Sequence, residues 1–231
     1  IIVIAHNEAD IIRERLENIL ALEYPTSKLE IVVASDRSTD DTVSLARDFH
    51  DRVIAFNHTE GGKSATRHTA IQRASQDILL FTDADTRYRP DCVRRLVDRF
   101  ADPTVGAVSG TLVSTSFSEG ALGTGMGLYW RWEYRLRSWQ GRLGILAKCS
   151  GANMGMRKSC YQDLPDTVDI DQMAALDALA AGYESVHASD AIAGEHFLPD
   201  PAEQLGVRRR LTIRALSALQ VQSWVFDPRR R

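Results

Sequence analysis

The sequence has few cysteines and no long apolar run. Its three cysteines, Cys92, Cys149 and Cys160, match no metal-binding spacing, and their odd number argues against a disulfide framework. No stretch approaches the roughly 18 apolar residues that a membrane-spanning helix needs. A formal net charge of -3 provides no basic surface of the kind that binds nucleic acid. We therefore expect reduced thiols, a cytosolic setting and no nucleic-acid partner.

An initiator methionine and a signal peptide are also lacking. The sequence opens directly on the apolar residues 1–5 and ends on the basic residues 228–231. We therefore expect an excised part of a longer chain, in which flanking segments are the place for a membrane anchor. The 231 residues, of which 44% are hydrophobic, favour one α/β domain with a helical appendage.

The first half of the sequence alternates regularly between apolar and amphipathic stretches. Strands are predicted over residues 1–5, 30–35, 52–56 and 78–81. Helices are predicted between them, and Ser38 or Thr39 is expected to cap the second one. Alternation at this spacing is typical of right-handed parallel βαβ units. The expected fold class is therefore α/β, with a mostly parallel central sheet flanked by helices.

The second half is less regular. Helices are predicted over residues 89–101, within 120–144, and over 169–181 and 201–224, and strands over 105–113 and 185–189. Gly182 is expected to cap the helix that ends at residue 181. Residues 149–157 are small and contain glycine, and no element is predicted for them. The last of these helices would form a C-terminal helical segment.

Two carboxylates follow the apolar run 78–81, in the sequence Thr82-Asp83-Ala84-Asp85. In open α/β sheets, ligands bind just beyond the carboxyl ends of the strands. Two acids one residue apart at such an end suit Mn²⁺ or Mg²⁺, with water and phosphate oxygens as further ligands. A solvated acidic turn is the alternative, and the motif alone does not decide between them.

Polar residues also follow the other predicted strands, at the same edge of the sheet. They are Asn7 and Glu8, then Asp36, then Lys63. Acids that accept hydrogen bonds from ribose or a base, a lysine near phosphates and a carboxylate-held metal together describe a nucleotide-diphosphate pocket. Asp36 as a helix cap and Lys63 as a solvated helix start are the alternatives. Neither a P-loop nor a G-x-G-x-x-G motif is present.

Six segments in order, AHNEAD, SDRSTDDT, GGKSAT, TDADT, SGANMGMRK and GYESVHASDA, resemble family 2 glycosyltransferases. These are inverting enzymes with the GT-A fold, and the resemblance is closest to membrane-associated bacterial members. It implies transfer of a sugar from a nucleotide diphosphate sugar, with UDP expected, to a carbohydrate or lipid-linked acceptor. It also implies a Mn²⁺ or Mg²⁺ cofactor and a part in cell-envelope or exopolysaccharide synthesis. Residues 1–113 would bind the donor, and residues 114–231 the acceptor and the catalytic base.

The resemblance also implies roles for individual residues. Asp36 would bind the nucleoside, Asp83 would face the ribose or uracil, and Asp85 would hold the metal. The donor-binding set is Ala5, Asn7, Glu8, Asp36, Lys63, Asp83, Ala84 and Asp85. The acceptor-side wall is Ser150, Gly151 and Ala152. Asp171 matches the general base, and Asp169 is the alternative because Ile170 stands where the family carries an acid.

Cations and a histidine complete the expected site. Arg209 and Arg210 stand where processive synthases carry Q-x-x-R-W, which argues against processive polymerisation. With Lys63 they would neutralise the departing diphosphate, unless they form a plain solvated helix face. His196 is expected as a third metal ligand beside Asp83 and Asp85, because imidazole accepts Mn²⁺ readily. A surface histidine is the alternative.

A stretch that includes Trp130, Trp132, Tyr134 and Trp139 is interleaved with arginines. It favours a packing face, or a face at a membrane surface on the cytoplasmic side of the cell membrane. Two other functions stay open. A sugar-phosphate nucleotidyltransferase would need a glycine-rich N-terminal loop, which AHNEAD does not provide. A degenerate nucleotide-sugar-binding module is suggested by Ile170 beside the predicted base.

Overall fold

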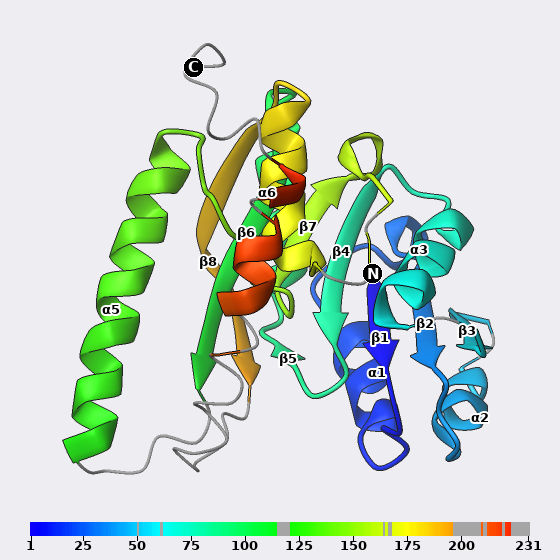
Figure 1. Ribbon diagram of the computed structural model, residues 1–231. Helices are drawn as coiled ribbons and strands as arrows, with labels where there is room; N and C mark the ends of the chain where they lie inside the picture. The colour runs from blue at the N-terminus through cyan, green and yellow to red at the C-terminus, as the bar shows by residue number, and fades with distance from the viewer. Residues whose placement is uncertain are drawn as a thin grey trace.

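A sheet of eight strands runs through the molecule in the order β3-β2-β1-β4-β7-β6-β8-β5, with helices on both faces (Figure 1). The structure is a computed structural model. It describes residues 1–49, 51–60, 62–114, 121–163, 165, 168–195, 209, 212–218 and 220–222. The mixed α/β architecture confirms the fold class expected from the sequence.

The first half forms parallel βαβ units, as its alternating pattern predicts. Its elements are β1 (Ile2–Ala5), α1 (Ile12–Leu20), β2 (Ile31–Asp36), α2 (Thr42–Arg47), β3 (Val53–His58), α3 (Lys63–Arg73) and β4 (Ile78–Asp83). Strand β1 pairs in parallel with β2 and with β4, and β2 pairs in parallel with β3. The carboxyl ends of these four strands therefore meet at one edge of the sheet.

The second half completes the sheet with mixed pairing. Its elements are β5 (Arg87–Tyr88), α4 (Cys92–Asp98), β6 (Val105–Ser114), α5 (Ala121–Arg142), β7 (Met154–Arg157), α6 (Ile170–Ala180) and β8 (Glu184–Glu195). Strand β7 is antiparallel to both β4 and β6, and β5 is antiparallel to β8, whereas β6 and β8 are parallel. Short 3₁₀ turns cover residues 26–28, 99–101 and 158–160.

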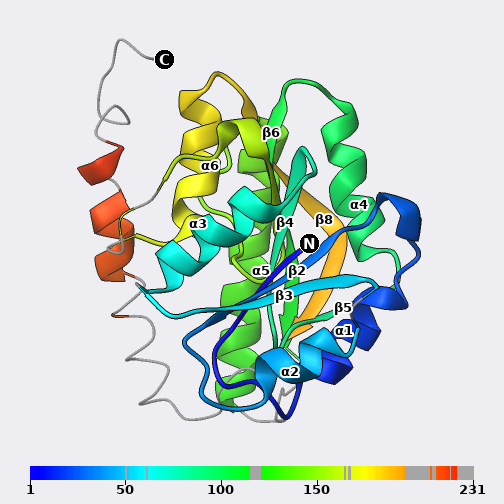
Figure 2. The same cartoon turned by 90° about the vertical axis from the view of Figure 1, so that its right-hand side faces the viewer.

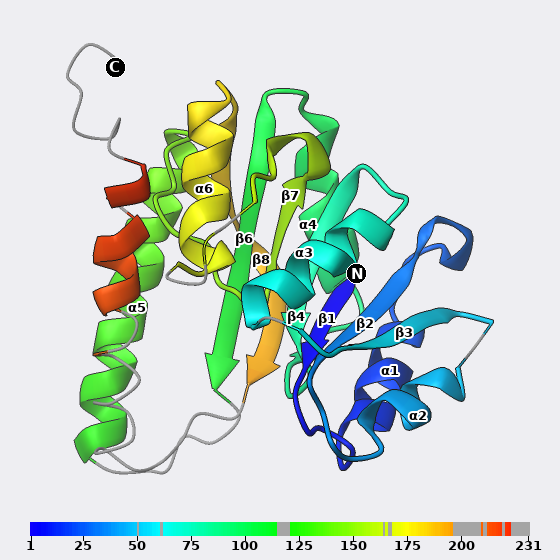
Figure 3. The same ribbon diagram turned by 45° about the vertical axis from the view of Figure 1, so that its right-hand side comes forward.

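Helices cover the two faces of the sheet over separate hydrophobic cores. Helices α3 and α6 lie on one face and α1 and α4 on the other (Figure 2). Ile12, Leu16 and Ile19 follow the helical period along α1, and all three are fully buried against the sheet. Burial of each such side chain contributes about 1.5–3 kcal/mol. The described helical residues 212–218 lie beside α6, as Figure 3 shows, with Ala218 in the same core.

Strand β7 was not predicted, although it links the two halves of the sheet. It has four residues, and Gly155 interrupts their apolar pattern. A Cβ at Gly155 would lie 2.6 Å from Leu80 Cδ2 and 3.1 Å from Phe100 Cε2, so the strand needs glycine for close packing. Strand β8 is also longer than expected, with 12 residues.

One further expectation about helices is wrong, and another holds only in part. Helix α2 begins at Thr42 after Asp41 and has no side-chain cap, because Ser38 Oγ instead accepts a hydrogen bond from the Asn7 N–H. In α5, Tyr134 does pack inside the molecule, with its ring stacked on that of His187. Trp132 and Trp139 are 60% and 59% exposed and do not pack there, and the side chain of Trp130 lies outside the described ones. Gly182 does follow α6 with a φ of 82°, as its expected role in ending the helix requires. All three cysteines are free and buried.

Candidate functional site

Two adjoining cavities open at the carboxyl ends of the parallel strands. The acidic cavity, of about 260 Å³, is lined by Ile4, Ala5, His6, Glu8, Asp36, Lys63, Asp83, Ala84 and Asp85. The main cavity, of about 380 Å³, is lined by Ile4, Lys63, Arg67, Phe81, Thr82, Asp83, Leu112, Ser150, Gly151, Ala152, Asp169, Ile170, Asp171 and Arg214. Ile4, Lys63 and Asp83 belong to both linings, so the cavities meet at these residues.

The loops after β1 and β2 are held together by hydrogen bonds. Asn7 and Arg37 both have a positive φ, of 55° and 57°, which turns the chain sharply as it leaves each strand. The Asn7 side-chain oxygen accepts a hydrogen bond from the Thr39 N–H at 2.9 Å, and Glu8 N–H donates to Thr42 Oγ1 at 2.8 Å. Asn7, expected to bind the donor, therefore uses its side-chain oxygen to join the two loops.

Carboxylates dominate the acidic cavity. Burial raises the pKa of Glu8, and the charges of Asp85 and Asp83 raise it further. Burial also raises the pKa of Asp85, with Asp83 adding to the effect. Lys63 Nζ lies 3.5 Å from Asp83 Oδ1. This cavity therefore carries more negative than positive charge at neutral pH.

Such a donor set fits a divalent cation. Hard carboxylate oxygens are the ligands that Mg²⁺ and Mn²⁺ accept, and a cation would relieve the mutual repulsion of Asp83 and Asp85. Within the described part of the chain, no three His, Cys, Asp or Glu side chains gather into a metal site. His196, expected as the third ligand, lies outside the described residues. Its role stays a prediction.

Behind the end of β4 lies a buried arginine that sequence reasoning missed. Arg15 is fully buried, and its guanidinium donates to Thr82 Oγ1 at 2.7 Å and to Asn18 Oδ1 at 2.6 Å. The same group lies 4.4 Å from the centroid of the Tyr88 ring. A signal was available, because Arg15 stands three residues after Ile12 and four before Ile19, on the apolar stripe of α1.

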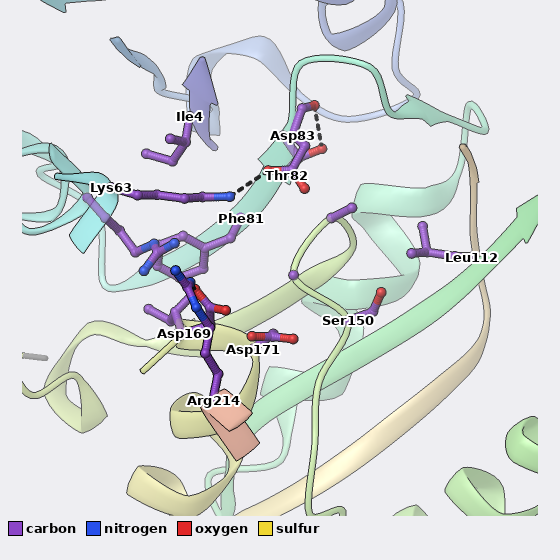
Figure 4. Close-up of a pocket in the computed structure, with 14 residues that line it drawn as sticks. Ile4, Lys63, Phe81, Thr82, Asp83, Leu112, Ser150, Asp169, Asp171 and Arg214 are labelled. Atoms are coloured by element: carbon purple, nitrogen blue, oxygen red, sulfur yellow. Dashed lines mark hydrogen bonds and ion pairs between the residues drawn. The ribbon is translucent and has the colours of Figure 1, made fainter. Parts of the chain in front are cut away.

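The two candidate bases differ in their partners. Asp169 forms an ion pair with Arg214, which comes from the described helical residues 212–218. Asp171 lies in the main cavity on the side of Ser150 (Figure 4), and Lys148 Nζ is 3.5 Å from its Oδ2. The pKa of Asp171 is raised by burial, which is opposed by Lys148, and Asp169 adds to the rise. Each acid therefore has a cation within ion-pair distance, and the position of Asp171 beside Ser150 and Gly151 favours it as the candidate base.

The remaining predicted residues divide between the cavities. Asp36, Ala5 and Ala84 line the acidic cavity, and the wall of residues 150–152 lines the main cavity. Gly151 faces α6, since a Cβ there would lie 3.5 Å from Asp171 Cβ. Arg209 is exposed and lines neither cavity, and Arg210 lies outside the described residues.

Solved structures share this fold. The mannosyltransferase PcManGT from Pyrobaculum calidifontis, solved with GDP-Man and Mn²⁺, aligns with a TM-score of 0.76 and 27% identity over 95% of this chain and 63% of its own. Staphylococcus aureus TarS 1-349 aligns with a TM-score of 0.64 over 97% of this chain and 71% of its own. At 15% identity TarS supports the fold alone. These likenesses confirm the expected GT-A fold.

Sequence comparison agrees with the structural likenesses. The poly-beta-1,6-N-acetyl-D-glucosamine synthase of Staphylococcus aureus (strain MSSA476) is 34% identical over 109 residues, which are 46% of this chain and 26% of the synthase. The chain thus spans about a quarter of the length of this relative. A family model described as Glycosyl transferase family 2 matches residues 1–164. The chain belongs to glycosyl transferase family 2.

Proposed function

We propose that this chain is the catalytic domain of an inverting glycosyltransferase, which moves a sugar from a nucleotide diphosphate sugar to an acceptor hydroxyl. One observation carries the proposal. The acid pair Asp83 and Asp85 and the candidate base Asp171 line two cavities that meet at Lys63. A donor bound across that junction would have its nucleotide in the acidic cavity and its sugar in the main cavity. Family membership supports the same reaction class.

In this proposal Asp171 acts as the general base. Its carboxylate takes the proton of the acceptor hydroxyl while the acceptor oxygen bonds to the anomeric carbon, and the bond from that carbon to the diphosphate breaks. The attack comes from the face opposite the leaving group, which inverts the anomeric configuration. Asp169 is held in its ion pair with Arg214 and serves to position the C-terminal helical residues.

The side chains of Asp83 and Asp85 would hold a Mn²⁺ or Mg²⁺ ion. When bound, the ion would supply positive charge against the departing diphosphate. Lys63 Nζ, 3.5 Å from Asp83 Oδ1, adds a second cation at the same place. Asp36 in the acidic cavity is the proposed partner of the nucleoside, which leaves residues 150–152 for the acceptor.

The relatives suggest which donor and acceptor classes to test first. TarS has been solved with UDP-GlcNAc, and PcManGT with GDP-Man and Mn²⁺. We therefore propose a UDP-sugar as the first donor to test and a GDP-sugar as the second. The similarity to a polysaccharide synthase favours a carbohydrate or lipid-linked acceptor and a part in cell-envelope or exopolysaccharide synthesis.

We also propose that α5 lies on the cytoplasmic surface of the cell membrane. No helix in the described ranges is both long and apolar enough to cross a bilayer. Trp132 and Trp139, seven residues apart, are exposed on one face of α5, beside the exposed Arg131 and Arg135. Aromatic and basic side chains together suit an interface with anionic lipid. Trp132→Ser/Trp139→Ser should reduce co-sedimentation with anionic vesicles, whereas Ile54→Ser should not; equal sedimentation would contradict the placement.

The central test is a thermal-shift screen of nucleoside diphosphates with and without Mn²⁺, followed by assay of nucleoside diphosphate release from donor sugars. A ligand that binds only the folded state raises its apparent stability. We expect a Mn²⁺-dependent rise and release of the diphosphate. Pyrophosphate release from a nucleoside triphosphate and a sugar phosphate would instead identify a nucleotidyltransferase. Donor binding without turnover for any acceptor would identify a binding module.

A further inference from the structure

Arg67 is a buried cation for which the proposed reaction has no role so far. It lies in α3 one helical turn after Lys63, so the two side chains share a face of the helix. Its side chain lines the main cavity, although the residue is only 4% exposed. Among the described residues, its guanidinium forms no hydrogen bond and no ion pair. Buried charges in proteins are normally paired, so this one calls for an explanation.

The acids around Arg67 already have cations of their own. Burial lowers the pKa of Arg67, and the charges of Asp169, Asp83 and Asp171 oppose this effect. Each of these three carboxylates forms an ion pair with another residue. The pairs are Asp83 with Lys63, Asp169 with Arg214 and Asp171 with Lys148. Among the described residues, Arg67 is therefore a cation of the main cavity lining that has no ion pair, unlike Lys63 and Arg214.

We propose that Arg67 binds the terminal phosphate of the donor's diphosphate, the phosphate that leaves with the nucleotide. This inference rests on the proposed function. A guanidinium presents parallel N–H groups that match two phosphate oxygens, and such bidentate pairs are among the strongest charged hydrogen bonds. Arg67 lines the main cavity but not the acidic one, which places it toward the sugar end of the diphosphate, beyond Lys63.

Contact with the leaving phosphate makes Arg67 a catalytic residue. Negative charge grows on that phosphate as its bond to the sugar breaks, and a cation fixed in place before the reaction stabilises this charge. Helix α3 and the surrounding core fix the side chain, because both Arg67 and its neighbour Thr66 are buried. The phosphate would also give the buried guanidinium its missing partner.

The test compares the binding of nucleoside diphosphates and monophosphates by calorimetry in the presence of Mn²⁺. UDP with UMP, and GDP with GMP, differ only in the phosphate that Arg67 would contact. We expect Arg67→Met to weaken diphosphate binding by about 10- to 100-fold and monophosphate binding by less than about twofold. Arg67→Lys keeps the positive charge but not the planar guanidinium, so its affinity for the diphosphate should fall less than that of Arg67→Met. The matched control is Arg73→Met, an exposed arginine of the same helix.

Three results would overturn the inference. Diphosphate affinity unchanged in Arg67→Met would show that the guanidinium does not contact the donor. Equal losses for diphosphate and monophosphate would show a structural effect, which the melting temperatures of both variants would also report. A loss confined to reactions with a phosphorylated acceptor would assign Arg67 to the acceptor instead. If the wild-type chain binds no nucleotide at all, the proposed function itself fails, which is a distinguishable outcome.

Discussion

The end of β4 separates two polar regions of different character. Behind the strand, Arg15 is fully buried but donates to Thr82 and Asn18 and lies over the Tyr88 ring. In front of it, Arg67 is almost as deeply buried but has no such partners among the described residues. Partnered groups fix a loop in place, whereas an unpartnered group beside a cavity is free to take a ligand. The comparison is why we assign Arg15 a structural role and propose a ligand for Arg67.

The largest effect is expected in the front region, at the base. Asp171→Asn keeps the shape of the side chain but cannot accept the acceptor proton. We expect kcat/KM to fall by about 10²- to 10⁴-fold, with the melting temperature maintained. Asp169→Asn is the matched control, and it should keep most of the activity because in the proposed function Asp169 only positions the helical residues that carry Arg214. A larger loss in Asp169→Asn than in Asp171→Asn would reverse the assignment.

The second-largest effect is expected on stability, in the region behind β4. Arg15→Met removes a donor from the hydroxyl of Thr82 and one of the two donors to the Asn18 side-chain oxygen, which keeps the Tyr88 N–H. We expect a loss of about 2–4 kcal/mol in the free energy of unfolding, measured by urea denaturation. The control is Arg13→Met, which breaks an exposed ion pair with Asp48 and should lose less than about 1 kcal/mol. Similar losses in the two variants would mean that Arg15 is not a structural anchor.

A smaller effect is expected on the pH profile. Lys148 opposes the rise in the pKa of Asp171 that burial causes, and Arg67 acts in the same direction as Lys148. A general base must be ionised, so activity is lost as the pH falls through its pKa. Without Lys148 that pKa rises, and the acid limb of kcat/KM should move to higher pH in Lys148→Met. Lys28→Met, at an exposed position, should leave the profile in place; an unmoved profile in both variants would exclude Asp171 as the titrating group.

The smallest effect concerns Asp177, a second buried carboxyl of α6. Burial raises its pKa to about 7, and the hydrogen bond from Gln222 opposes this rise. Between the unfolded pKa of 3.8 and the folded value, the folded state holds a proton that the unfolded state has lost. Stability should therefore fall as the pH rises across this interval. The melting temperature of Asp177→Asn should fall less between pH 4 and about 8 than that of the wild-type chain. Identical slopes in the two proteins would contradict the raised pKa of Asp177.

The sequence predicted the parallel half of the fold because each strand there is a continuous apolar run followed by a turn and a helix. It did not predict β7, since four residues around Gly155 carry too little periodicity. Long-range pairing with β4 and β6, rather than local preference, makes that segment a strand.

The sequence pointed to the acids of the candidate site but not to two of its arginines. Asp83, Asp85 and Asp171 stand in recognisable segments, and the structure places them around two adjoining cavities. Asp169 and Asp171 were not separable in sequence, because only their partners distinguish them. Arg15 and Arg67 were missed because an arginine within a helix is usually solvated, and its burial depends on contacts between distant segments.

The junction of the two cavities limits how this site can diverge. Among the residues that the structure describes, only Ile4, Lys63 and Asp83 line both cavities. Changes at Asp36 or at residues 150–152 alter one cavity each. If the proposed function holds, the preference for the donor and the preference for the acceptor can therefore be changed separately at those positions. A substitution at one of the three shared positions would change both cavities, and with them the preferences for donor and acceptor together.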